Sequence, residues 1–513
     1  MSHVHLWLER LVRALLDFIA VQVAAVLALA SLTLPPVLGI PEQVVPADAT
    51  LVRYYLHTLL PLSLIFPIMH SLFGLYTKMR GYTCESKMRR AAFSAAVATL
   101  VLVFLTYLTA HPLLPRATAL IFGLLAIGAA TSVRWLKEYL FHREAETFKG
   151  SHVEIIANPN HTILVVGGAG YIGAILVAKL LARDCRVRLL DNLMYGDEAI
   201  KSVLGHPHLQ FIKGDCRNIE EVVRAMNNVR SVIHLAAIVG DPACAAEDEN
   251  ALQINYAATR MMLEIAKGNG IERFVFASSC SVYGASEDLM DERSVTEPIS
   301  LYAETKLNSE YVLLQAKSST FHPTVLRFAT VFGLAPRPRF DLVVNLLTAK
   351  AIEDGVITIF NGDQWRPFIH VDDIAEGILL TVFAPVEAVS GEILNIGDDR
   401  LNYSLAQVAE KIRAQIPNTR VEYTENNDRR NYRVSFKKVQ DCLGFRARRS
   451  LEEGIAEIKR AYESGLIRNY RQPFYSNLAF LKERGVVAAK TELDSKVMAA
   501  FAGAGARRMA AAR

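Results

Sequence analysis

A short apolar segment that leads directly into three glycines constrains this chain more than any other feature. Residues 162–166 are a continuous run of apolar and β-branched residues, which is typical of a buried parallel strand. Gly167, Gly170 and Gly173 follow, and an apolar-periodic segment typical of a helix continues to Ala182. Glycine permits a tight turn, a close approach of the backbone to a pyrophosphate and close packing of the helix on the strand. Because a helix N-terminus also attracts phosphate, the sequence predicts a dinucleotide-binding unit.

A carboxylate stands where the adenosine ribose of a dinucleotide would lie. Residues 186–190 have the pattern of a second strand, and Asp191 follows them about 20 residues beyond the glycine loop. A carboxylate there accepts hydrogen bonds from the ribose hydroxyls and repels a 2′-phosphate, so we expect NAD rather than NADP. An aspartate that only forms a turn is the alternative interpretation, and the spacing disfavours it.

The glycine loop with Asp191 and Asn192 resembles the extended short-chain dehydrogenases/reductases, over residues from about 161 to about 460. The resemblance implies an α/β fold of the Rossmann type: a doubly wound parallel sheet with a smaller C-terminal substrate-binding subdomain. It also implies a set of cofactor contacts in the glycine loop, at strand ends and in a catalytic helix. These residues are Gly167, Gly170, Tyr171, Ile172, Gly173, Asp191, Asn192, Asp215, Ala236, Tyr302 and Lys306.

Three side chains in the middle of the chain predict acid–base chemistry. Ser279 ends the apolar segment 274–279, and Tyr302 and Lys306 follow at i, i+4 spacing on one face of a predicted helix. An ammonium group beside a phenol favours the phenolate and lowers the phenol pKa from about 10 towards the operating pH. Tyr302 can therefore act as a general base on a sugar hydroxyl, with Ser279 sharing the proton. A pair on a helix surface without a catalytic role is the alternative.

The two residues after Ser279 distinguish between reactions of the resembled family. Its 4,6-dehydratases carry an acidic residue or an Asp-Glu pair there, whereas this chain has Cys280 and Ser281. Neither residue replaces a carboxylic acid well, so loss of water is disfavoured. Cys280 could still act as a base if its pKa were lowered, and a small buried residue without a catalytic role is the alternative.

The C-terminal part contains the residues that the resemblance assigns to the substrate. Thr330 lies in a segment similar to the strand that contacts the sugar, where epimerases often have an asparagine. Asn345 resembles an asparagine that meets the phosphates of the nucleotide sugar. Arg366 is expected to pair with the diphosphate, for which a guanidinium is geometrically suited. Arg430 lies near the family's second phosphate-binding arginine, and with Ser279 these residues form the predicted substrate site.

The leading functional hypothesis is an NAD-dependent nucleotide-sugar epimerase similar to the UDP-hexose 4-epimerases. In this hypothesis Tyr302 removes the proton of the C4 hydroxyl, and the C4 hydride passes to NAD⁺ and returns to the other face of a 4-keto sugar. A 4,6-dehydratase, a decarboxylase and a 4-ketoreductase are alternatives of the same class. A polyprenyl-diphosphate-linked sugar is an alternative substrate. A membrane scaffold that carries a degenerate dehydrogenase domain is the alternative from a different class.

The first 140 residues are largely apolar and predict a transmembrane domain of four helices. Four segments reach the roughly 17–25 apolar residues that a span needs, with almost no globular sequence between them. They are residues 18–34, 56–76, 91–110 and 117–133. Buried helices of a soluble domain are the alternative. Basic loops alternate along this region, which predicts both termini and the catalytic domain on the cytoplasmic side.

The membrane region also resembles that of bacterial capsule and O-antigen enzymes, through residues 71–76 and 115–116 with the basic residues around them. This resemblance implies the bacterial inner membrane as location, the lipid bilayer as a partner, and a role in surface-polysaccharide biosynthesis. The resembled dehydratases carry a further nucleotide-binding-like domain before the catalytic one. This chain has only about 20 residues between the two regions, which is too few for a domain.

Length and composition complete the expectations. The 513 residues exceed one ordinary domain, and we divide them into residues 1–140 (transmembrane), 141–160 (cytoplasmic linker), 161–485 (catalytic) and 486–513 (an Ala-rich tail expected to pack poorly). A net charge of +4 gives no case for nucleic-acid binding. Six scattered cysteines without a C-x-x-C pair argue against disulfides and against a metal site. The remaining expected partners are a UDP-linked nucleotide sugar and, from the family resemblance, a second copy in a homodimer.

Overall fold

The computed structural model describes residues 2–30, 64–73, 75, 84–108, 118, 121–132, 161–426, 428, 430–486 and 491–512. The chain separates into two compact units. The first comprises Met1–Thr147 with Arg293–Val295, and the second comprises Phe148–Glu292 with Thr296–Arg513. The expected linker, residues 141–160, lies outside the described residues.

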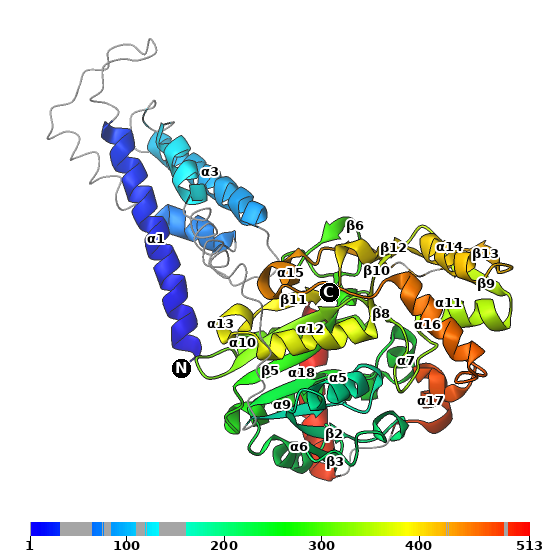
Figure 1. The fold of residues 1–513 in the computed structure, drawn as a ribbon. Coiled ribbons are helices and arrows are strands. Elements are labelled where there is room, and N and C mark those ends of the chain that lie inside the picture. Colours follow the sequence, from blue (N-terminus) through cyan, green and yellow to red (C-terminus); the bar gives the residue numbers. More distant parts are fainter. Residues whose placement is uncertain are drawn as a thin grey trace. The chain divides into compact units, whose positions relative to one another are not determined.

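A seven-stranded parallel sheet forms the centre of the second unit (Figure 1). Its strand order is β11-β7-β5-β4-β1-β2-β3. The strands are β1 (Thr162–Val166), β2 (Arg186–Asp191), β3 (Leu209–Lys213), β4 (Ser231–His234), β5 (Arg273–Ser279), β7 (His322–Phe328) and β11 (Ile393–Ile396). Chain order runs outward in both directions from β1, which confirms the predicted doubly wound sheet of the Rossmann type. Ligands of such sheets bind at the carboxyl ends of the strands where the order reverses, here β1 and β4.

Alternate residues of β1 show how the two faces of this sheet are covered. Ile163 and Val165 pack in one core cluster with α5 (Tyr171–Leu181) and α12 (Val371–Phe383). Leu164 and Val166 belong to a second cluster with α6 (Ile219–Met226), α9 (Ala258–Gly268) and α10 (Leu301–Gln315). Successive side chains of a strand point to opposite faces, so a strand buried on both sides is apolar throughout. This is why residues 162–166 have no polar alternation.

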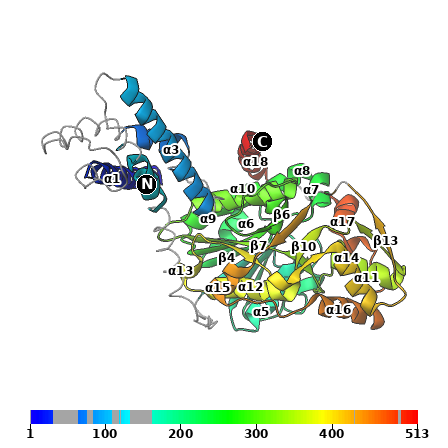
Figure 2. The same cartoon turned by 90° about the horizontal axis from the view of Figure 1, so that it is seen from above.

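The C-terminal part of the second unit forms the smaller subdomain. Three small sheets contribute to it: β12 (Asn402–Ser404), β10 (Trp365–His370) and β8 (Thr330–Phe332); β13 (Arg420–Thr424) and β9 (Val356–Phe360); β14 (Asn431–Val434) and β6 (Ala285–Met290). Figure 2 shows α11 (Val343–Glu353), α14 (Leu405–Gln415) and α16 (Leu451–Glu463) gathered at one end of this unit. A third core cluster joins these helices to β9 and β10, through residues such as Val344, Ile357 and Val408.

The remaining helices of this unit are short, with one exception. They are α7 (Asp241–Ala246), α8 (Asp248–Leu252), α13 (Val386–Val389), α15 (Lys437–Leu443), α17 (Asn477–Arg484), the longer α18 (Glu492–Ala512), and single turns at Glu198–Ile200, Gln253–Ala257, Cys280–Tyr283, Asp399–Leu401 and Pro473–Tyr475.

The expectation of a poorly packed tail is wrong for α18. Met498 is fully buried, and the Asp494 carboxylate accepts bonds from Asn218 Nδ2 and Ile219 N, both at 3.0 Å. The helix therefore closes the N-terminus of α6.

The first unit is helical in its described parts. It contains α1 (Ser2–Ala30), α3 (Cys84–Leu108) and helical residues 64–72 and 121–132. Small side chains fill the contacts between these helices, and fully buried examples are Ala28, Ala91, Ala95, Ala98 and Ala126. Larger apolar side chains point outward, among them Leu100, Phe104 and Leu124.

Over the described residues, no helix combines the length and the apolar composition needed to cross a membrane. This finding overturns the predicted four-helix transmembrane domain, together with the bilayer partner and the inner-membrane location. Of the predicted spans 56–76 and 117–133, the structure describes helix over 64–72 and 121–132, and most of their other residues lie outside the described residues. The first half of α1 carries Glu9, Arg10, Arg13 and Asp17. The rest of the first predicted span, residues 31–34, lies outside the described residues.

Candidate active site

A cleft of about 570 Å³ lies at the carboxyl ends of β1, β2, β4 and β5. Residues of the glycine loop, the Asp191 region and the catalytic helix line it, and so do residues of the smaller subdomain. The cleft therefore opens at the sheet edge where a doubly wound fold binds its ligands.

Two glycines of the loop are required by its geometry. Gly167 has a φ of +84°, and a Cβ there would lie 2.6 Å from the backbone nitrogen of Ala236. A Cβ on Gly173 would lie 2.4 Å from the Gly167 carbonyl oxygen. Gly170 is the N-cap of α5, whose first residues Tyr171 and Ile172 line the cleft. The loop thus brings backbone and a helix N-terminus close to the cleft, an arrangement that fits the pyrophosphate of a dinucleotide.

Asp191 is held by the backbone on either side of it. Its Oδ2 accepts a hydrogen bond from Ala169 N at 2.9 Å, and its Oδ1 accepts one from Leu193 N at 2.8 Å. Burial raises the pKa of Asp191, and the two backbone bonds partly oppose this effect. Each carboxylate oxygen keeps a free lone pair, because an ionised carboxylate offers about four acceptor positions. The side chain can therefore still accept bonds from ribose hydroxyls.

Asp215 is already engaged by neighbouring side chains. It pairs with Arg217 at 2.9 Å, and Asn192 Nδ2 donates to its Oδ2 at 3.2 Å. Burial alone would raise the pKa of Asp215, but the ion pair outweighs it and the pKa is lowered. Asp215, Asn192 and Ala236 all line the cleft.

Ser279, Tyr302 and Lys306 come together at the end of β5. Tyr302 lies in the first turn of α10, whose N-cap is Ser300, and both Tyr302 and Ser279 line the cleft. Lys306 is one turn further along and only 3% exposed. Its Nζ donates to Ala277 O at 2.8 Å and lies 5.8 Å from the centre of the Tyr302 ring. The three side chains thus face one point of the cleft.

The electrostatics of this group differ from the expectation. Burial raises the pKa of Tyr302 well above its ordinary value, and the negative charge of Asp241 adds to this effect. The positive charge of Arg339 and the nearby Ser279 hydroxyl oppose it. Burial also lowers the pKa of Lys306, to about 8. Desolvation therefore shifts the pKa of Tyr302 in the direction opposite to the one expected from a neighbouring ammonium group.

A buried ion pair behind this group was missed by the sequence reasoning. Glu310 lies one turn beyond Lys306 on the same helix face, and its carboxylate pairs with Arg327 of β7 at 2.7 Å. Arg327 also donates to the Tyr283 hydroxyl at 3.0 Å, and Glu310 accepts a bond from Ser278. These contacts fix α10 against β5 and β7. The i, i+4, i+8 spacing of Tyr302, Lys306 and Glu310 was the available signal.

Cys280 is a buried residue of this network, with its Sγ 3.4 Å from Arg327 O. Burial raises the pKa of its thiol, so Cys280 does not have the lowered pKa that a base would require. Ser281 Oγ is different, because it is buried without a hydrogen-bond partner and its residue lines the cleft.

The predicted substrate residues fall into two groups. Thr330 begins β8 and lines the cleft. Asn345 is completely buried and is outside the cleft lining. Its Oδ1 accepts a bond from Gly333 N at 2.9 Å, and its Nδ2 donates to Arg339 O at 2.8 Å. The structure thus places Asn345 where it holds the 333–339 loop.

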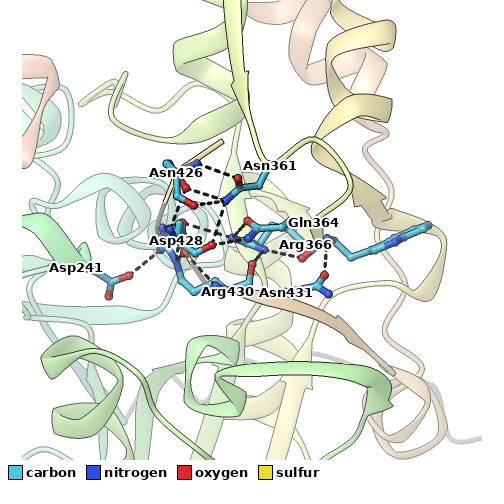
Figure 3. A network of polar contacts seen from close by, with 9 residues as sticks. Asp241, Asn361, Gln364, Arg366, Asn426, Asp428, Arg430 and Asn431 are labelled. Atoms are coloured by element: carbon cyan, nitrogen blue, oxygen red, sulfur yellow. Dashed lines mark hydrogen bonds and ion pairs between the residues drawn. The ribbon is translucent and has the colours of Figure 1, made fainter. Parts of the chain in front are cut away.

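Arg366 and Arg430 lie together in a polar network (Figure 3). Arg430 Nε donates to Asp428 Oδ1 at 2.9 Å, and Arg366 Nη2 lies 3.6 Å from Asp428 Oδ2. Arg430 also pairs with Asp241 at 2.7 Å, and Asp241 accepts a bond from the N-cap residue Ser300 at the same distance. Asp241 and Asp428 were not predicted. The contact between Asp241 and Arg430 joins segments 189 positions apart, whereas Asp428 lies only two residues before Arg430, a local spacing that was visible in the sequence.

Comparisons with known proteins agree with this geometry. A model of the NAD dependent epimerase/dehydratase family matches residues 163–397. A putative UDP-glucose 4-epimerase of Methanocaldococcus jannaschii is 29% identical over 305 residues, 58% of this chain and 96% of that protein. The uncharacterized UDP-glucose epimerase YtcB of Bacillus subtilis is 32% identical, over 46% of this chain and 76% of that protein.

Solved structures give the same result. MoeE5 in complex with UDP-glucuronic acid and NAD is 29% identical with a TM-score of 0.52, and the match covers 59% of this chain and 99% of that one. The UDP-glucuronic acid 4-epimerase of Bacillus cereus, in complex with UDP-glucuronic acid and NAD, is 25% identical with a TM-score of 0.54. That match covers 59% of this chain and 100% of the other. The dTDP-glucose 4,6-dehydratase DesIV of Streptomyces venezuelae is 26% identical with a TM-score of 0.54, over 59% of this chain and 97% of that one.

Proposed function

This chain belongs to the NAD dependent epimerase/dehydratase family, and from that premise we propose that it inverts the C4 hydroxyl of a UDP-linked sugar through a 4-keto intermediate. Its cofactor is NAD, and its activity is that of an NAD-dependent enzyme similar to UDP-sugar epimerases. The single observation that carries the proposal is the gathering of Ser279, Tyr302 and Lys306 in the lining of one cleft, with no carboxylate at positions 280 and 281.

The side chains of the cleft divide the work of such a reaction. Tyr302 takes the proton of the C4 hydroxyl and later returns it, and Ser279 holds the sugar oxygen and the phenol in hydrogen-bonding contact. Lys306, fixed by Ala277 O, supplies the positive charge that a developing phenolate needs. When bound, NAD⁺ would accept the hydride from C4, and its reduced form would return it. Arg366 and Arg430 are the groups suited to the substrate diphosphate.

The alternatives within the family differ in their demand for an acid beside the sugar. A 4,6-dehydratase must protonate a leaving hydroxyl, and Cys280 and Ser281 provide no carboxylic acid for this step. The raised pKa of the Cys280 thiol also removes it as a base. Ser281, with its unpartnered hydroxyl in the cleft, is instead suited to a hydrogen bond with a sugar hydroxyl. These observations favour epimerisation.

The proposed substrate is a sugar nucleotide, and no role in a particular pathway is proposed. The role in surface polysaccharides rested on the membrane region, which the described helices do not support. UDP is the proposed nucleotide because both relatives compared by sequence, and two of the three solved structures named above, have a UDP sugar in their descriptions. A homodimer, which the family resemblance implies, is a further part of the proposal and is checked by the molecular mass in solution.

A labelled substrate tests the reaction. The full chain is incubated in ordinary water with UDP-glucose, UDP-galactose and UDP-glucuronic acid, each carrying deuterium at C4, and the products are analysed by NMR and mass spectrometry. Inversion with retention of deuterium is expected, because the hydrogen leaves and returns within one active site. Loss of deuterium to the solvent would contradict hydride return at C4. A product lacking the elements of water would show a dehydratase.

A further inference from the structure

Arg337 is a buried cation in the wall of the cleft, and we propose that it binds the diphosphate of NAD. Its side chain is only 2% exposed, and no carboxylate among the described residues forms an ion pair with it. This inference depends on NAD as the cofactor and is independent of the reaction at C4.

The contacts of Arg337 hold its guanidinium without neutralising it. One Nη2 bond reaches Asn477 Oδ1 at 2.8 Å, and a long one reaches Phe474 O at 3.5 Å. The guanidinium lies over the Tyr195 ring, 3.7 Å from its centre. The Nε atom is buried and has no hydrogen-bond partner in the described part of the chain. Arg337 therefore keeps both its charge and a free donor.

The other arginines of the cleft lining differ from Arg337 in this respect. Arg339 pairs with Asp341 at 2.9 Å, while Arg366 and Arg430 share Asp428. Burial lowers the pKa of Arg337 to about 10, which reflects the cost of a desolvated charge. A buried charge is normally compensated by a partner, so a site with an unpaired arginine in a ligand cleft favours an anionic ligand.

The position of Arg337 selects the anion. Tyr195 follows Asp191 by four residues, and Asn477 Nδ2 donates to Val239 O, just after β4. Both neighbours of Arg337 thus belong to the cofactor half of the cleft. The Arg366–Arg430 network instead meets Asp241 and the N-terminus of the catalytic helix. Asp191 disfavours a cofactor that carries a 2′-phosphate. The diphosphate is then the anionic group of the cofactor that Arg337 can bind.

The C-terminal segment is the part of the chain that positions Arg337. Asn477 N donates to Asp341 Oδ2 at 2.9 Å, and Phe340 N donates to Tyr475 O at 2.8 Å. The ring of Phe480, on α17, lies 5.0 Å from that of Tyr195. Tyr475, Asn477 and Phe480 thus hold the 333–342 loop and the Tyr195 ring beside the cofactor half of the cleft.

Ligand binding tests the proposal without relying on turnover. Calorimetry on the full chain, freed of nucleotide with charcoal, measures NAD, ADP-ribose, adenosine and UDP. Arg337→Met should weaken NAD and ADP-ribose by roughly tenfold or more, the effect of losing a charge-assisted hydrogen bond. Adenosine and UDP should bind as before, because neither occupies the diphosphate position of the cofactor. Arg337→Lys should recover part of the affinity for NAD.

Two further variants make the result decisive. Arg413→Met removes an exposed arginine of α14 and should leave all four affinities unchanged. Asn477→Ala keeps the Arg337 charge and removes its anchor, so it should give a smaller loss for the same two ligands and remains informative if Arg337→Met does not fold. Unchanged NAD affinity in Arg337→Met would overturn the proposal. An equal loss for adenosine would assign Arg337 to adenosine stacking, and a loss confined to UDP would assign it to the substrate; both results also overturn it.

Discussion

Asp241 pairs with Arg430 at 2.7 Å and joins the substrate-side arginines to the catalytic helix. Its other carboxylate oxygen accepts a hydrogen bond from Ser300 Oγ, also at 2.7 Å, and Ser300 is the N-cap of the helix that carries Tyr302. The charge of Asp241 is also one of the causes that raise the pKa of Tyr302. Asp241 thus contacts Arg430, which is proposed to bind the diphosphate of the substrate, and it also raises the pKa of Tyr302, the proposed base.

Replacing Asp241 by asparagine should move the pH dependence of the reaction. The amide keeps an acceptor for Ser300 but removes the negative charge, so the phenolate of Tyr302 is less disfavoured and its pKa falls. The rising limb of the kcat/KM profile should therefore shift to lower pH. Asp248→Asn, an exposed change on α8, is the matched control and should leave the profile in place. A shift to higher pH would contradict the assignment of Tyr302 as the base.

Removing the phenol hydroxyl should separate chemistry from cofactor binding. Tyr302→Phe is expected to keep the fold and the bound NAD and to lose turnover by roughly 10²-fold or more, the usual contribution of general acid–base catalysis. Tyr311→Phe, on the same helix, is the control and should retain activity. Absorbance of the released cofactor and turnover of UDP-sugars measure the two effects. Comparable turnover in the two variants would exclude Tyr302 as the base.

The buried charge of Lys306 should lower the free energy of unfolding, although the residue supports activity. Burial lowers its pKa to about 8, so the folded state binds fewer protons than the unfolded state between about pH 8 and 10.5. Lys306→Met should raise the free energy of unfolding at pH 7 by an amount on the order of 2 kcal/mol, since it removes a desolvated charge. It should also abolish turnover.

The sign of this effect can be checked by pH. The wild-type chain gains stability as the pH rises through this window, so the difference between the variant and the wild type should shrink at pH 9.5. Urea unfolding at pH 7 and pH 9.5 measures it. A difference that grows with pH would show that Lys306 is not held as a buried cation.

The Glu310–Arg327 pair should be a major source of stability around the catalytic group. Glu310→Gln leaves the Arg327 guanidinium buried without its counter-charge, and breaking such a pair costs about 3–5 kcal/mol. Glu410→Gln removes an exposed pair with Arg413 and should cost about 1 kcal/mol or less. Urea unfolding of both variants tests the contrast. Equal losses would mean that the buried pair does not stabilise this region.

The choice of cofactor should depend on Asp191. Asp191→Ala removes both the ribose acceptor and the group that disfavours a 2′-phosphate, so NAD should bind about tenfold more weakly while the discrimination against NADP relaxes. Asp197→Ala, in the following turn, is the control. Calorimetry with both dinucleotides measures the preference. An unchanged ratio of the two affinities would show that Asp191 supports only the turn formed with Ala169 and Leu193.

Features with a local cause were predictable from the sequence. The β1–loop–α5 unit, Asp191 at the end of β2, and the i, i+4 pair of Tyr302 and Lys306 depend on spacings within about one element. Strand geometry and helix periodicity translate these spacings directly into positions. The doubly wound sheet was expected from the family resemblance that these motifs carry. The small Cys280 and Ser281 after Ser279 were equally visible in the sequence.

The apolar N-terminal region shows where such reasoning fails. Apolar composition indicates that side chains avoid water, but it does not determine where helices begin and end or what their faces contact. The four-span prediction treated each apolar segment as one continuous helix, whereas no helix among the described residues combines the length and the apolar composition of a span.

By itself, the sequence determined the cofactor-binding unit and brought Ser279, Tyr302 and Lys306 into consideration, because their relations are set by backbone geometry over a few residues. Only the tertiary structure decided that burial dominates the pKa of Tyr302 and that Asn345 supports a loop away from the cleft. It also decided that Asp241 and Asp428 neutralise Arg430 while Arg337 has no carboxylate partner among the described residues. These properties depend on desolvation and on contacts between segments up to 189 positions apart, which no local pattern encodes.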